Sequence, residues 1–286
     1  MEKQDATKRI VTFLIIVSVL SSIFYVLVNK NGGMEGVGAF YTLFLVWSPA
    51  VAALVTTFIY QRNVRGLGWG FGKPVYYLIA FLLPIFYAGI AYGVIWLLGL
   101  GKVDTSALGG SFLQALLNAL TLGLIETIFL VTGEEIGWRG LLVPQLARLN
   151  TFTRTALISG VIWGIWHMPL IITGDYKGGA PVWYSVACFM VLVVGVSFAF
   201  AWLRLASGSI WPAVLLHAVH NKFIQGVLDV ITVDTGKTQY FTTEFGLGLA
   251  IMGIIVGLVF WKIGLPKGTE QESVQGVRSL GAPKPG

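Results

Sequence analysis

Residues 111–140, SFLQALLNALTLGLIETIFLVTGEEIGWRG, contain an apolar run that ends abruptly in charged side chains. A membrane-spanning helix needs about 20 largely apolar residues, which 111–133 supplies. Glu134, Glu135 and Arg139 follow directly. Ionisable groups within membrane spans are costly, at about 2.5 kcal/mol or more each near the centre, so they mark functional sites. The stretch therefore predicts a membrane helix with a candidate site at its end.

The rest of the chain has the same apolar character. Of its 286 residues, 56% are hydrophobic and 11% are charged, whereas soluble domains carry about 25% charged residues. The composition predicts an all-α polytopic membrane protein with about eight transmembrane helices that enclose an intramembrane cavity. The expected spans are 10–28, 38–60, 75–100, 111–133, 155–173, 181–203, 209–231 and 245–262.

The distribution of basic residues predicts the orientation. Most of the 19 Lys and Arg residues lie in the two terminal segments and in the loops on their side. Cytoplasmic loops carry this excess, so both termini are expected in the cytoplasm, with the chain in the cell membrane. The net charge of +6 then reflects contact with membrane lipids and not with nucleic acid. We expect one integral membrane domain over 1–265 and a polar, disordered cytoplasmic tail over 266–286.

Polar side chains recur inside two later spans. His167 ends the stretch WGIWH, and His217 and Asn221 stand four residues apart in LLHAVHN. This spacing puts His217 and Asn221 on one helix face. By depth, Glu134, His167 and His217 can meet in one cavity open toward the cytoplasmic leaflet.

These residue types suit hydrolysis of an amide. A carboxylate removed from water can act as a base near neutral pH, and a His on the same water would help to polarise it. A second His and an Asn amide can hold a developing oxyanion. Glu135 and Arg139, also four residues apart, can neutralise each other and leave Glu134 free. Zinc stays open, because it accepts Glu and His ligands.

Three short motifs on separate spans resemble those of the CAAX-processing and bacteriocin-processing membrane endopeptidases, which include the type II CAAX prenyl endopeptidases. The EExxxR motif matches Glu134, Glu135 and Arg139, and the HxxxN motif matches His217 and Asn221. The FxxxH motif matches at His167, with Trp163 in the place of Phe; Trp163 keeps an aromatic wall. The resemblance covers about 111–225.

The resemblance implies peptide-bond hydrolysis inside the membrane. It implies that Glu134 and His167 activate water and that His217 and Asn221 stabilise the oxyanion. Members of the family are labelled metalloproteases and are also described as metal-free with a glutamate base; we favour the metal-free version and expect no cofactor, with zinc as the alternative. The implied partner is a membrane-associated peptide or protein, lipidated or not. His220 has no motif role, so a structural or substrate-facing place is expected for it. Two other functions stay open: a non-catalytic bacteriocin-immunity or binding protein of the same fold, and a proton-coupled transporter.

Overall fold

The computed structural model describes residues 2–108 and 111–266, so the predicted tail lies outside the described residues except for Pro266. These residues form ten α-helices: α1 Glu2–Lys30, α2 Gly36–Gln61, α3 Pro74–Leu97, α4 Phe112–Leu120, α5 Leu122–Glu135, α6 Val143–Ala147, α7 Phe152–Thr173, α8 Val182–Ser207, α9 Trp211–Phe223 and α10 Leu247–Ile263. Two π-helical segments, Ile136–Leu142 and Ile224–Leu228, follow α5 and α9. Within the described ranges, the strands are the short antiparallel pair β1 Lys102–Val103 and β2 Thr232–Val233.

The all-α polytopic membrane fold is confirmed. Six helical stretches of the described chain are long and apolar enough to cross a membrane: Lys3–Lys30, Gly36–Gln61, Pro74–Leu97, Phe112–Ala147, Phe152–Thr173 and Val182–Ser207. The other two expected spans contain shorter helices. α10 has 17 residues, and α9 has 13 before it passes into the π-helical segment.

The expected fourth span is not one continuous helix. It is divided into α4 and α5 at Thr121, whose φ of −121° and ψ of −91° are not helical. The Thr121 hydroxyl donates to the carbonyl of Leu117 at 2.6 Å. Such a bond from a Thr side chain to the preceding turn competes with regular helix geometry. An apolar run shows the length of a span, and it does not show this break.

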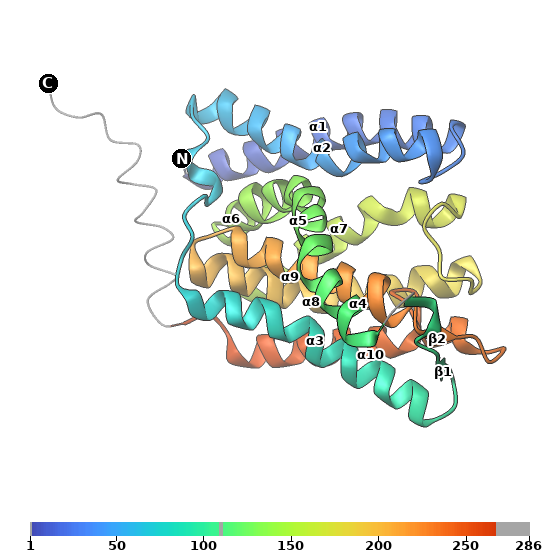
Figure 1. Ribbon diagram of the computed structural model, residues 1–286. Coiled ribbons are helices and arrows are strands. Elements are labelled where there is room, and N and C mark those ends of the chain that lie inside the picture. Colours follow the sequence, from blue (N-terminus) through green and yellow to red (C-terminus); the bar gives the residue numbers. More distant parts are fainter. Residues whose placement is uncertain (1, 109–110, 267–286) are drawn as a thin grey trace, which may run out of the picture.

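Helix packing brings α5 and α9 together, while one side of α5 stays exposed. α1 and α2 pair along one side of the molecule, and α3 and α10 lie along the other (Figure 1). α5 packs against both α2 and α9, and α8 packs against α7 and α10. The start of α1 and the end of α10 lie at the same end of the bundle (Figure 1). The two helices that carry the predicted acidic and His/Asn motifs are therefore neighbours.

Two glycines near the end of α5 explain how closely α2 approaches it. A Cβ on Gly133 would lie 2.6 Å from the carbonyl oxygen of Val46, and one on Gly137 would lie 2.4 Å from Cβ of Pro49. Small residues allow this close packing of helix backbones in membranes. The glycines thereby let α2 form a wall beside the carboxylates.

Candidate functional site

The two carboxylates lie where α5 ends and the π-helical segment begins. Glu134 is 6% exposed and Glu135 is fully buried. A π-helical turn holds one residue more than an α-turn, and such turns occur frequently at functional sites. Here it keeps the chain helical through the glycines and carries Arg139 back toward Glu135.

Glu135 is the centre of an ion-pair network. Its Oε1 accepts from Nη1 of Arg139 at 2.9 Å, the contact that the four-residue spacing indicated, and lies 2.9 Å from Nδ1 of His217. The Arg139 guanidinium also lies 4.0 Å from the ring centre of Trp163 and 3.9 Å from that of Phe200. Aromatic faces stabilise a cation that has lost its water. The buried charge of Arg139 is therefore compensated on several sides.

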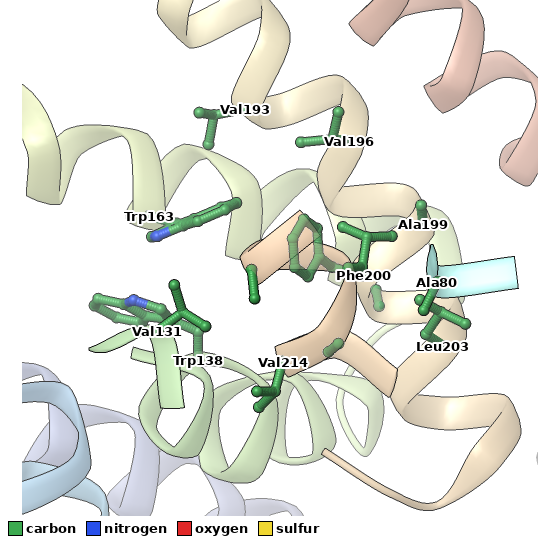
Figure 2. Close-up of a cluster of buried hydrophobic side chains, with 14 of the residues drawn as sticks. Ala80, Val131, Trp138, Trp163, Val193, Val196, Ala199, Phe200, Leu203 and Val214 are labelled. Atoms are coloured by element: carbon green, nitrogen blue, oxygen red, sulfur yellow. The ribbon is translucent and has the colours of Figure 1, made fainter. Parts of the chain in front are cut away.

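Glu134 points to different partners. Its Oε2 accepts from the indole Nε1–H of Trp163 at 2.9 Å and lies 4.0 Å from Nε2 of His167. Figure 2 shows Trp163 of α7 among the apolar side chains of the core, with Val131, Val193 and Phe200 nearby. The tryptophan thus does more than form an aromatic wall, because a Phe at this position has no N–H to donate.

His167 presents one ring nitrogen to Glu134. Its Nδ1 lies 2.9 Å from the carbonyl oxygen of Trp163, one turn earlier on α7. A carbonyl only accepts, so Nδ1 carries the hydrogen and Nε2 of the neutral ring holds a lone pair. The ring packs edge-on against Trp166 and close to Phe189, which fixes its orientation.

His217 and Asn221 come from consecutive turns of α9. His217 is 4% exposed, and Glu135 holds its Nδ1. Asn221 is half-buried, and its amide forms no hydrogen bond with another described residue. The position of Asn221 therefore depends on the backbone of α9.

One cavity of about 570 Å³ joins these side chains. Glu134, His167, His217 and Asn221 all line it. Its walls come from α2, α5, α7, α8 and α9 and are mainly apolar, with residues such as Val46, Leu130 and Phe189. Glu135 and Arg139 do not line this cavity, so within the described chain they support it from behind.

Sequence reasoning missed part of this cavity. Glu244, Tyr176 and Gln225 also line it, together with His220. Glu244 is 6% exposed although it stands in the connection before α10. The path of a connection leaves no periodic pattern in the sequence, so the sequence gives no sign that Glu244 is buried at the cavity.

No group of three or more His, Cys, Asp or Glu side chains is placed to hold a metal ion in the described part of the chain. Glu134 and His167 face each other, whereas His217 directs Nδ1 at Glu135. Catalytic zinc sites use three protein ligands. The residues present do not assemble such a set.

The fold and the cavity define a class: an all-helical polytopic membrane protein with a buried Glu/His/Asn site. Residues 110–223 match the family described as "Type II CAAX prenyl endopeptidase Rce1-like". A curated relative, "CAAX prenyl protease 2" of Methanococcus maripaludis, is 29% identical over 132 residues, which are 44% of this chain and 46% of that protein. The chain thus spans less than half the length of this relative. Both matches support the family that the three motifs indicated, the CAAX-processing and bacteriocin-processing membrane proteases.

Proposed function

We propose that this protein is an intramembrane endopeptidase that hydrolyses a peptide bond of a membrane-associated protein or peptide, lipidated or not. The observation that carries the proposal is the pair formed by Oε2 of Glu134 and Nε2 of His167, 4.0 Å apart at the wall of the cavity. Two polar atoms at this separation can share one bridging water. The family match supports peptide-bond hydrolysis as the reaction.

In the proposed reaction, Glu134 takes a proton from the bridging water while the water oxygen attacks the substrate carbonyl carbon. His167 receives a hydrogen bond from the same water at Nε2 and orients it. The attack breaks the carbonyl π bond and gives a tetrahedral oxyanion. Glu134 then returns the proton to the leaving amine as the C–N bond breaks, so the carboxylate is regenerated.

His217 and Asn221 are proposed to hold the oxyanion. Since Nδ1 of His217 donates to Glu135, the ring offers a second N–H at Nε2 only as an imidazolium. Glu135 holds Nδ1 and so orients this ring, as a buried carboxylate orients a catalytic His in other hydrolases. The Asn221 amide supplies the second donor. Donors placed in advance where charge develops are among the strongest contributions to catalysis.

Zinc does not enter this mechanism, because the described residues around Glu134 do not provide three suitable ligands. We propose in addition that the chain forms one integral membrane domain over 1–265, with both termini in the cytoplasm and the cavity open toward the cytoplasmic leaflet. Two observations support this orientation: the basic residues of the α2–α3 loop, Arg62, Arg65 and Lys73, and the common end of the bundle that holds the start of α1 and the end of α10 (Figure 1).

The test compares peptide termini in membranes of a host that lacks its own copy of the protein. One culture makes the wild type, and two others make Glu134→Gln and Glu126→Gln at matched levels. Glu126 is an exposed acid on the same helix and does not line the cavity, so its variant is the matched control. New termini with the wild type and Glu126→Gln, and none with Glu134→Gln, are the expected result. Identical termini in all three, with an intact protective phenotype, would favour a non-catalytic binding or immunity protein; substrate flux that follows a pH gradient would favour a transporter.

A further inference from the structure

A second polar cluster faces the same cavity and has no part in the proposed reaction. It consists of His220, Glu244, Tyr176, Gln225 and Tyr87, and is called the Glu244 cluster below. All of these except Tyr87 line the cavity. His220 and Glu244 are 7% and 6% exposed. Burying ionisable groups is costly unless they are paired, so this cluster requires an explanation.

The carboxylate of Glu244 organises the cluster. Its Oε1 lies 2.7 Å from Nε2 of His220, and its Oε2 accepts from Nε2 of Gln225 at 2.9 Å and from the Tyr176 hydroxyl. The Tyr87 hydroxyl pairs with Nδ1 of His220. Burial alone raises the pKa of Glu244, but the hydrogen bonds and charge of His220, with those of Tyr176 and Gln225, lower it to about 2. The carboxylate is therefore ionised, and hydrogen bonds to an ionised acceptor are the strong ones.

The cluster ties α9 to three other parts of the chain. His220 is on α9, Tyr87 is on α3, and Tyr176 lies in the connection between α7 and α8. Glu244 lies in the connection before α10. Because Glu135 contacts His217 and Glu244 contacts His220, two carboxylates from different segments hold one helix through side chains a single turn apart.

This restraint acts where α9 is least regular. The π-helical segment begins at Ile224, four residues after His220. Asn221, next to His220, has no side-chain hydrogen bond among the described residues that would hold it independently. The Tyr176 ring also lies 6.2 Å, centre to centre, from the ring of His167. The cluster thus adjoins both the proposed oxyanion donors and the proposed water-activating His.

We infer that Glu244 is a positioning residue: through His220 it sets the rotation of α9, and with it the placement of His217 and Asn221. This inference rests on the proposed function. It means that the connection before α10, which lies outside the three motifs, also affects the rate of turnover. Glu244 touches no reacting atom in this account. Tyr176 and Gln225 hold the carboxylate in place, and Tyr87 fixes the ring of His220.

The experiment compares two losses of a single hydroxyl group. In Tyr176→Phe the bond to Glu244 is lost. Tyr184→Phe is the control. The Tyr184 hydroxyl, on α8, donates to the carbonyl of Tyr240 at 2.6 Å, and Tyr240 lies in the same connection as Glu244. Tyr184 and Tyr240 do not line the cavity in the described chain. The substrate is a synthetic peptide that spans a terminus found in the membrane comparison above, and the full-length protein is used.

Tyr176→Phe and Glu244→Gln are expected to lower kcat about tenfold and to leave KM within about twofold, since the loss affects placement of the oxyanion donors and not substrate binding. Tyr184→Phe is expected to leave both constants unchanged. In an Asn221→Ala background, the further loss from Tyr176→Phe should shrink, because the two residues act on the same step. Equal effects of the two Tyr variants, or full additivity with Asn221→Ala, would overturn the inference.

A second measurement needs no turnover. Amide hydrogen exchange over 211–228 should be faster in Glu244→Gln and Tyr176→Phe than in the wild type, and unchanged in Tyr184→Phe. Unchanged exchange in all three variants would overturn the inference even if the wild type cleaves. A wild type that cleaves nothing would defeat the proposed function alone, and the exchange result would still decide whether Glu244 orders α9.

Discussion

The indole Nε1–H of Trp163 donates to Oε2 of Glu134 at 2.9 Å, while the carbonyl of the same tryptophan accepts from Nδ1 of His167. One residue therefore orients both members of the proposed water-activating pair, the first through its side chain and the second through its backbone. The motif of the related proteases has Phe at this position, and Phe can provide only the second contact.

Trp163→Phe is expected to lower kcat about tenfold, the order of effect for a lost hydrogen bond to a charged group. His167 keeps its backbone partner in this variant, and a phenyl ring stays beside Arg139, so the lost hydrogen bond is the one to Glu134. The measurement is steady-state cleavage of a peptide substrate. Trp202→Phe is the control, because its indole donates to the carbonyl of Gly264 away from the cavity. Equal activity of the two variants would show that the bond to Glu134 does not matter.

The two neighbouring carboxylates are expected to differ in what they contribute: Glu135 to the stability of the fold and Glu134 to cleavage. Glu135→Gln removes the charge that compensates buried Arg139, so it should lower the free energy of unfolding by about 3 kcal/mol. Glu134→Gln keeps an acceptor for Trp163, so it should change the free energy of unfolding by less than about 1 kcal/mol. The same variant should abolish cleavage. Thermal unfolding in detergent measures the stability of both variants. A Glu134→Gln protein that unfolds as readily as Glu135→Gln would contradict this division.

The proposed mechanism predicts activity without a bound metal. After exhaustive chelation and removal of the chelator, the purified enzyme should keep its full rate, and elemental analysis should find less than one zinc per chain. Loss of activity that returns on addition of zinc would instead place a metal at Glu134 and His167.

Close packing of α2 against the chain after α5 predicts a steric effect. Gly137→Ala places a Cβ 2.4 Å from Cβ of Pro49, and such overpacking costs about 1–3 kcal/mol of stability. Gly93→Ala on α3 is the control, because nothing lies within 4 Å of its added Cβ. Unfolding midpoints of the two variants should differ clearly. Equal midpoints would mean that α2 moves aside at no cost in stability and is not held firmly against the chain after α5.

Glu244 predicts a pH dependence of stability. Its pKa is about 2 in the folded protein, below the ordinary 4.5, so the unfolded chain binds its proton more readily. The contribution of the ionised Glu244 carboxylate to folding stability is therefore complete above pH 4.5 and is lost as the pH falls toward 2. The difference in unfolding midpoint between wild type and Glu244→Gln should be constant near neutral pH and shrink in acid. A difference that grows in acid would mean that the carboxyl is protonated in the folded state.

Much of the fold follows from composition and spacing. Apolar runs located the long helices, although α1 begins at Glu2, well before the start expected for the first span. The four-residue spacing of Glu135 and Arg139 predicted their contact. Depth along the spans correctly brought Glu134, His167 and His217 to one cavity. Their chemical roles stay predictions until they are measured.

The remaining features depend on local or long-range geometry that hydropathy does not record. The break at Thr121 is visible only in its non-helical backbone angles, in the middle of an otherwise apolar run. The π-helical turns lie in stretches that read as continuous apolar helix, so hydropathy does not distinguish them from α-helix. Glu244 and Tyr176 reach the cavity from connections, and contacts between connections and helices far apart in sequence set their positions.

The cavity extends beyond the residues that match the family, 110–223. The family match ends at residue 223 and begins at 110, yet Val46 and other residues of α2 form one wall, and Glu244 lies beyond the match. Homologues could therefore keep the same reacting groups while the flanking wall diverges. Under the proposed function, transplanting α2 between two such enzymes should transfer substrate preference and leave the chemistry intact.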